Sequence, residues 1–193
     1  MPRRFFHRHQ PAQDAWSWLK IGIGGALGIG IVAFLGDVSD SALLIAPFGA
    51  TAVLLFGVPD SPMAQPANVI GGHFLASLLA LALKSVLPPE WWAIALTVGV
   101  AMFAMALMRL THPPAGADPI VIFLSDPTWM FLWTPILAGS VLLVALATLV
   151  HRLPPHTEYP IAPKNTGGEG QLYVLETLGK PDREARAVFD EAS

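Results

Sequence analysis

The chain contains no cysteine and few charged residues. Without cysteine, its 193 residues cannot form a disulfide, a thiolate nucleophile, or a zinc or iron–sulfur site with cysteine ligands. Charged residues make up 13% of the chain, about half of their usual share in soluble proteins. The formal net charge of -3 provides no basic field for nucleic acid. These absences exclude a disulfide scaffold and a DNA- or RNA-binding protein.

The sequence also lacks the short signatures of common enzymes. It has no G-x-S-x-G, H-E-x-x-H or Walker motif, and no nucleophile stands out beside a base. His7 and His9 lie in a basic N-terminal segment, where solvation is the commoner state than metal binding. We therefore expect no enzyme activity, no metal site and no cofactor.

Apolar sequence fills the middle of the chain. Hydrophobic residues make up 53% of the total, and only nine charged residues fall between Trp16 and Val150. Such a segment cannot cover itself with polar surface, which excludes a soluble globular protein. We predict an integral membrane protein with a basic cytoplasmic N-terminus at 1–15, a transmembrane domain at 16–152, and a polar, partly disordered cytoplasmic tail at 153–193.

Four segments have about the 20 apolar residues that a membrane-spanning helix needs: 16–36, 68–87, 91–110 and 128–150. All six tryptophans lie near the predicted ends of these spans, as in an interfacial aromatic belt. Segments 42–57 and 117–124 are apolar but short, and both are interrupted by proline or glycine. We expect an all-α membrane protein of four long transmembrane helices plus two short, broken elements that re-enter or half-span the membrane.

The two short elements resemble each other. Residues 47–50 (PFGA) match residues 114–117 (PAGA) at an offset of 67, and Phe56 matches Phe123 at the same offset. The pattern predicts two related halves. Interrupted apolar segments in corresponding positions of two halves point to the binding site of a transporter.

Basic residues indicate the orientation in the membrane. Four of them before or early in the first span, and Arg152 after the last one, place both termini in the cytoplasm, in a bacterial inner membrane. If the short elements re-enter, there are four spans, with Lys84 inside and Arg109 outside. If they cross, there are six spans in an inverted repeat, with these two positions exchanged. The charge counts tie, and we prefer four because eight residues cannot cross alone.

The first candidate site surrounds residues 109–119 (RLTHPPAGADP). Arg109, His112 and Asp118 are costly within a membrane unless they are paired or hydrated. Gly116 and Ala117 open the following helix, where free N–H groups and the helix dipole favour an anion. The alternative is structural: Arg109 reaches lipid headgroups, His112 stabilises a turn and Asp118 caps a helix.

The second candidate site lies around the other short element and the start of the second long span. Gly49 and Ala50 lie at the start of a helix, and His73 places a ring inside a span. Neutral hydrogen-bond donors come from Thr51, Gln65 and Asn68. The alternative here is a hydrogen bond between packed helices. The glycine-rich first span would permit packing into a homo-oligomer.

These motifs resemble the HPP family of integral membrane proteins over about residues 16–152. The resemblance rests on an ordered set of segments: 47–50, 56–57, 61–66, 68–73 and 111–117. It implies four transmembrane segments and, by similarity to plastid and cyanobacterial members, nitrite transport. We expect a transporter or channel for a small inorganic anion, with nitrite as the first candidate, bound at broken-helix N-termini. The alternative is a non-transporting membrane module whose tail binds a partner.

Overall fold

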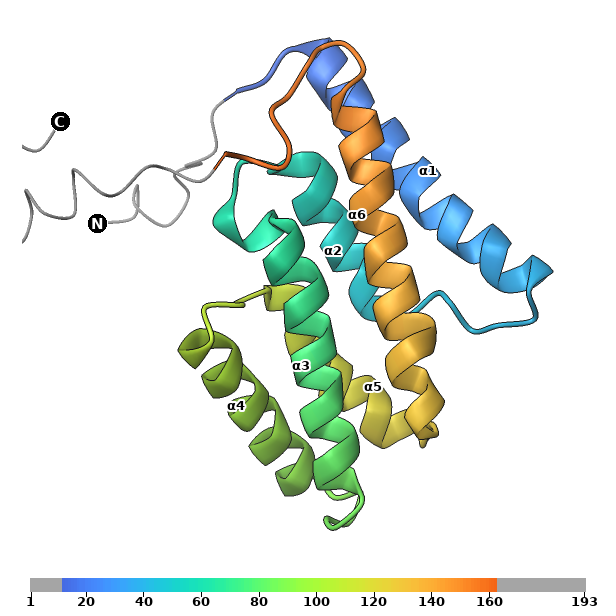
Figure 1. Cartoon of the computed structure of the whole chain (residues 1–193), viewed down its shortest axis with the longest axis vertical. Coiled ribbons are helices and arrows are strands. Elements are labelled where there is room, and N and C mark those ends of the chain that lie inside the picture. The colour runs from blue at the N-terminus through green and yellow to red at the C-terminus, as the bar shows by residue number, and fades with distance from the viewer. Residues whose placement is uncertain (1–11, 163–193) are drawn as a thin grey trace, which may run out of the picture. The chain divides into compact units, whose positions relative to one another are not determined.

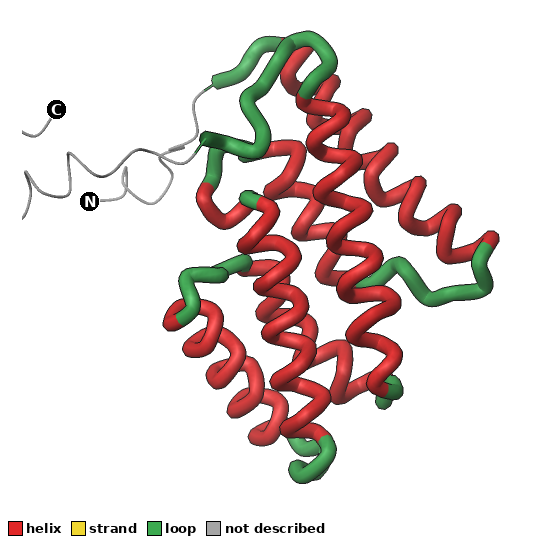
Figure 2. Tube along the Cα trace, viewed as in Figure 1, coloured by secondary structure: helices red, strands yellow, loops and turns green. Residues whose placement is uncertain are grey.

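The computed structural model describes residues 12–162, and no strand occurs among them (Figures 1 and 2). The α-helices within this range are α1 (Ala15–Val38), α2 (Ala46–Gly57), α3 (Pro66–Lys84), α4 (Trp91–Leu107), α5 (Asp118–Ser125) and α6 (Ala138–His151). Shorter turns are η2 (Pro62–Ala64), η3 (Pro113–Ala117), η4 (Trp129–Leu132) and η5 (Trp133–Leu137). The all-α prediction is confirmed. The tail predicted at 153–193 is described only as far as Ala162.

Among the described residues, three helices are long and apolar enough to cross a membrane: Ala15–Val38, Pro66–Lys84 and Trp129–His151. Each corresponds to a predicted span. The fourth predicted span corresponds to α4, which has 17 residues and ends at Leu107 because the chain turns left-handed at Arg109. The predicted count of four long spans is therefore not confirmed.

Successive helices run in opposite directions, with α1, α3 and α5 pointing one way and α2, α4 and α6 the other (Figure 1). The start of α1 and the end of α6 share one end of the bundle, where Lys20 Nζ donates to the carbonyl oxygens of Leu153 and Pro155. The start of α3 lies at this end too, since Tyr159 donates to the carbonyl of Ala64 at 3.0 Å. In the four-span interpretation α3 would start at the opposite end, so this arrangement matches the six-pass alternative.

Glycines allow the helices of the bundle to approach closely. Gly24 and Gly28 on α1 leave room for the ring of Phe56, which would lie 2.7 to 2.8 Å from a Cβ at either position. Gly139 on α6 faces the ring of Phe48 from α2 in the same way. This glycine face of α1 is thus occupied within the chain.

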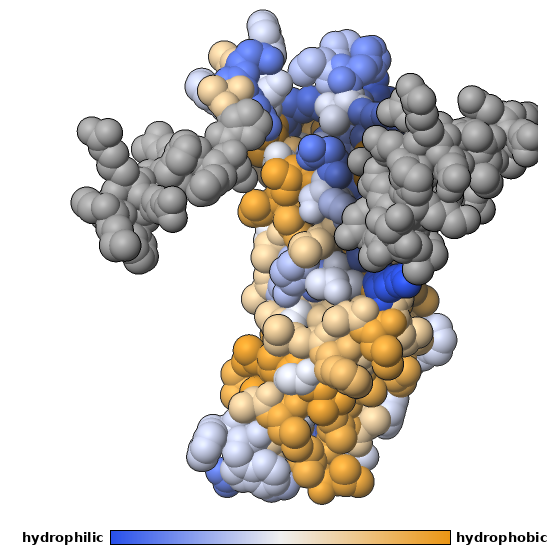
Figure 3. Space-filling view, turned by 90° about the vertical axis from the view of Figure 1, so that its left-hand side faces the viewer, coloured by the Kyte–Doolittle hydropathy of each residue, from blue (hydrophilic) through white to orange (hydrophobic). Residues whose placement is uncertain are grey.

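The outer surface is apolar, as a lipid-facing surface should be. Figure 3 shows hydrophobic side chains over the lower part of the face on the side of α4, and Phe103 and Leu107 of α4 are exposed. The six tryptophans are also exposed and lie at the start of α1, the start of α4 and along η4 and η5. Because those starts lie at both ends of the bundle, the tryptophans form belts at two levels.

Candidate functional site

Five polar side chains meet inside the bundle, and all five are completely buried. We call them the polar cluster: Thr51 of α2, His73 and Ser77 of α3, His112 just before η3, and Asp118 at the start of α5. Polar groups in a membrane interior are expensive unless they bond to one another. The cluster lies where α5 packs against the long helix α3 and where α2 reaches α3 through the side chains of Phe48 and Thr51.

His73 joins the two short helices. Its Nε2 atom lies 2.8 Å from Thr51 Oγ1, and its Nδ1 atom lies 2.8 Å from Asp118 Oδ2. The Phe48 ring packs on the imidazole in a T-shaped arrangement, at a centroid distance of 5.2 Å. His73 is the eighth residue of α3, about 10 Å along a helix about 28 Å long. The ring therefore lies towards the middle of a spanning helix.

His112 approaches the same threonine from the other side. Its Nε2 atom lies 3.0 Å from Thr51 Oγ1, and its Nδ1 atom lies 2.7 Å from the carbonyl oxygen of Met63. Extended backbone before Pro113 directs the ring inward. Gly72 makes this approach possible, because a Cβ there would lie 2.7 Å from His112 Cβ.

Asp118 is the acid of the cluster. Its Oδ2 atom contacts His73 and accepts a hydrogen bond from Ser77 Oγ at 3.3 Å. Its Oδ1 atom is buried and has no hydrogen-bond partner among the described residues. Buried carboxylate oxygens are rarely left unpaired, so this atom marks a place where a further donor would fit.

The cluster also relates the two predicted halves. Asp118 follows Thr51 by 67 residues, the offset that aligns the PFGA and PAGA segments. These two equivalent positions contact opposite nitrogens of His73. The packing is reciprocal as well, since Phe48 of the first half faces Gly139 and His112 of the second half faces Gly72. Two related halves of opposite orientation would produce such contacts, although the repeat itself stays a prediction.

Three of the site residues predicted from the sequence come together, namely Thr51, His73 and His112. Gly49 and Ala50 are exposed on the outer side of α2. Gly116 and Ala117 are half-buried in η3, directly before Asp118. These four residues make no side-chain contribution to the cluster.

Gln65 and Asn68 have structural contacts. Gln65 donates to the carbonyl oxygens of Pro59 and Ser61 and accepts from the backbone N–H of Ile161, which ties the chain after α6 to the start of α3. Asn68 donates to the carbonyl of Thr111 at 3.0 Å. Both side chains hold loops rather than point into the cluster.

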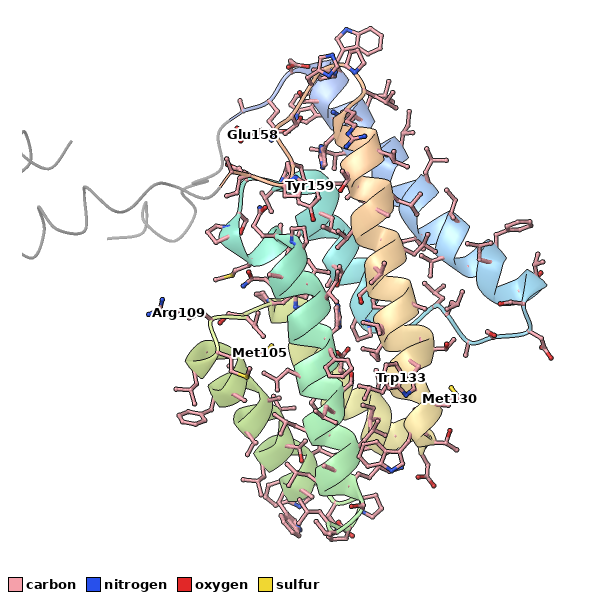
Figure 4. The ribbon with its side chains drawn as sticks, viewed as in Figure 1. Met105, Arg109, Met130, Trp133, Glu158 and Tyr159 are labelled. Carbon is pink, nitrogen blue, oxygen red and sulfur yellow. The ribbon has the colours of Figure 1, made fainter. Side chains whose placement is uncertain are left out.

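Arg109 lies outside the cluster. Its side chain is exposed and points away from the helices (Figure 4). Its backbone adopts a φ of 57° and ends α4, with the next N–H, of Leu110, bonded to the carbonyl of Met105 at 2.8 Å. Asn68 Nδ2 contacts the Arg109 carbonyl at 3.4 Å, which puts Arg109 at the same end as the start of α3.

Sequence reasoning missed Ser77 and left Asp118 out of the binding set. Ser77 lies four residues after His73, which is the spacing that places two side chains on one face of a helix. Asp118 follows the PAGA segment and holds the position equivalent to Thr51. Both signals are visible in the sequence, but neither identifies the partner that makes the residue important.

A pocket of about 700 Å³ lies away from the cluster, between α1, α2 and the chain after α6. Lys20, Asp60 and His151 are among its lining residues. It lies at the polar end of the bundle and contains no residue of the polar cluster. Within residues 12–162, no group of three or more histidine or acidic side chains is arranged to hold a metal ion.

Comparison with known proteins agrees with this membrane architecture. The family model described as HPP, transmembrane region, matches residues 10–160. Two transmembrane proteins of Dictyostelium discoideum are 32% and 31% identical over 155 residues. The matches cover 76% of this chain but 54% and 50% of the relatives, so the chain spans about half of their length. No solved structure matches. The chain belongs to the HPP transmembrane family.

Proposed function

We propose that the protein moves a small inorganic anion across the membrane, with nitrite as the first substrate to test. The observation that carries the proposal is the polar cluster at the junction of two short helices inside an apolar bundle. If these positions had only a structural role, apolar side chains would make the bundle more stable. Buried ionisable residues inside membrane domains commonly mark substrate or ion pathways.

The two short helices support an anion site. No side chain within the described residues caps the start of α2 or of α5. Thr51 is the sixth residue of α2 and Asp118 the first of α5, so both helix starts lie close to the cluster. The N-terminal end of a helix carries partial positive charge, which stabilises an anion. An ionised Asp118 would repel an anion, so binding requires its charge to be compensated by His73 or by a proton.

The closed geometry supports a carrier mechanism. All five side chains of the cluster have no solvent exposure, so the site is shut from both sides. Movement of an anion then requires the halves of the bundle to open alternately, as in transporters built from inverted repeats. This proposal predicts saturable flux rather than the linear flux of an open pore.

Charge distribution supports cytoplasmic termini. Lys20, Arg109 and Arg152 lie at the end of the bundle that holds the start of α1 and the end of α6. Lys84 lies at the other end, where it pairs with Asp126. We propose that the end with more basic residues, among those described, faces the cytoplasm, in a bacterial inner membrane.

Uptake of nitrite into liposomes containing the purified protein tests the function. We expect saturable uptake above that of protein-free liposomes, and less uptake of nitrate, formate or chloride. His112→Gln should reduce the uptake strongly, whereas His156→Gln, at an exposed position, should not. Absence of protein-dependent flux for all four anions would reject transport and favour the alternative, a membrane module without transport activity.

A further inference from the structure

The geometry of the polar cluster limits the positions that its hydrogens can take. The Met63 carbonyl oxygen only accepts, so His112 Nδ1, 2.7 Å away, carries a hydrogen. His112 Nε2 then either accepts from Thr51 or carries a second hydrogen, in which case the ring is cationic. The protonation of His112 therefore depends on the direction in which the Thr51 hydroxyl points.

Thr51 has one hydroxyl hydrogen and three polar neighbours. These are the Nε2 atoms of His73 and His112, at 2.8 and 3.0 Å, and the Pro47 carbonyl, at 3.2 Å. If Thr51 donates to His112, then His73 Nε2 must donate to Thr51. If Thr51 donates to His73, then His112 Nε2 must donate to Thr51, and the His112 ring is cationic. The two directions of the hydroxyl thus give the two rings opposite roles.

These two arrangements contain the same number of hydrogens and have zero net charge. In the first, one hydrogen is shared between His73 Nδ1 and Asp118 Oδ2, and His112 is neutral. In the second, neutral His73 donates through Nδ1 to ionised Asp118, and His112 carries the positive charge. Conversion requires Thr51 to give its hydrogen to His112 while it takes one from His73.

A third arrangement holds one more hydrogen. When Thr51 donates to Pro47, both Nε2 atoms can carry a hydrogen, and His73 and Asp118 still share one. Every polar atom in this chain of hydrogen bonds then has a compatible partner, and the net charge is +1. The cluster can therefore gain one proton without losing a hydrogen bond, and the gained charge would attract an anion.

Within residues 12–162, no other ionisable side chain faces the cluster from the helices packed around it. The α2 and α4 segments contain no titratable residue, and α5 contains only Asp118. On α3, Lys84 lies at the far end and pairs with Asp126. On α6, His151 bonds to the carbonyl of Leu55. Among the residues described, proton uptake in the cluster thus involves His73, His112 and Asp118.

We propose that the polar cluster binds one proton together with the transported anion and passes it through Thr51 between the two histidines. This inference rests on the proposed anion transport and makes it proton-coupled. The unpartnered Asp118 Oδ1 atom provides the buried position at which a proton donor first makes contact. The proton enters at Asp118 when the site opens to one side, and water accepts it from His112 when the site opens to the other side, so no hydrogen accumulates over a cycle.

Liposomes that contain a pH-sensitive dye test the coupling. A nitrite gradient should acidify the interior faster with the protein than without it. Thr51→Ser keeps the hydroxyl and should acidify within about twofold of the wild type. Thr51→Val removes the hydroxyl that bonds to both histidines. It should lower the rate at least about tenfold, the factor that corresponds to a loss of about 1.4 kcal/mol. Thr97→Val is the matched control, because Thr97 is also buried and donates to the carbonyl four residues earlier.

Infrared titration of the purified protein provides a readout that needs no transport. We expect a protonated-carboxyl band that changes with pH and is absent in Asp118→Asn, and Thr51→Val should uncouple it from the imidazole bands. Nitrite uptake without proton movement, equal in wild type and Thr51→Val, would overturn the relay and leave anion transport standing. A titrating carboxyl band without any anion flux would reject transport and retain the proton site. Absence of both the band and the proton movement overturns the inference, even where Thr51→Val does not fold.

Discussion

Thr51 and Asp118 contact opposite nitrogens of a single imidazole, each at 2.8 Å, although they lie 67 residues apart on different helices. They occupy the same position in the two resembling segments of the chain. His73 therefore bridges the two short helices by hydrogen bonds. A movement of either helix must therefore change the hydrogen bonding of the ring.

The His73–Asp118 pair is the first test of this arrangement. Removing one partner of a buried charged pair leaves the other unsatisfied, at a cost of about 3–5 kcal/mol. We expect Asp118→Ala and His73→Ala each to lower the thermal unfolding temperature in detergent, and the double variant to lose less than the sum. Lys84→Ala is the control, since its partner Asp126 is exposed and such pairs contribute about 1 kcal/mol or less. Equal effects of Asp118→Ala and Lys84→Ala would contradict the assignment.

The second prediction concerns Gly72, which packs against the segment that carries His112. A Cβ at this position would lie 2.7 Å from His112 Cβ and 2.9 Å from the Leu110 carbonyl oxygen, so Gly72→Ala must displace the segment that carries His112. We expect a loss of about 1–3 kcal/mol in unfolding free energy together with reduced nitrite uptake. Gly99→Ala has open space around the added methyl and should be neutral or slightly stabilising. A Gly72→Ala protein with wild-type stability would show that the contact is not tight in solution.

We expect the docking of Tyr159 at the polar end of the bundle to depend on pH (Figure 4). Burial raises the pKa of Tyr159, whose hydroxyl donates to the carbonyl of Ala64. The folded state thus favours the neutral phenol. Its contribution is fully present below the unfolded pKa of about 10 and is lost as the pH rises above that value.

Trypsin cleavage after Arg152 measures whether the chain around Tyr159 stays docked. We expect cleavage to accelerate above about pH 10, and Tyr159→Phe to remove this dependence. The substitution should also cost about 1 kcal/mol, because one buried hydrogen bond is lost. Tyr173→Phe is the control for the other tyrosine of the chain. If the pH dependence survives in Tyr159→Phe, another group is responsible.

Arg109 provides a test of which predicted site residues take part in transport. Its guanidinium is exposed and its contribution to the fold comes from the backbone that ends α4. We expect Arg109→Gln to keep nitrite uptake within about twofold of the wild type, as surface substitutions usually change little. His112→Gln should lose most of the uptake. A well-folded Arg109→Gln protein with strongly weakened nitrite uptake would return Arg109 to the site.

Part of this architecture depends on composition and local sequence. Few charges and long apolar runs determine a membrane protein, because a lipid-facing surface excludes charge whatever the order of packing. Proline and glycine act on the backbone next to them, which is why the broken elements around residues 47 and 114 could be located in advance. His73 and His112 could be singled out for the same reason: ionisable side chains are rare in spans.

The tertiary structure alone decided which of those residues meet. Each hydrogen bond among Thr51, His73, His112 and Asp118 joins residues that are 22 to 61 positions apart in the sequence. These contacts therefore depend on how whole helices pack. Gly72 and Gly139 admit the two short segments to the interior, whereas the left-handed turn at Arg109 directs its side chain outward. The sequence contained the chemical groups of the site. Helix packing decided which of these groups form the site. A hydrogen bond requires two atoms within about 3 Å, and spacing along the chain does not specify that distance.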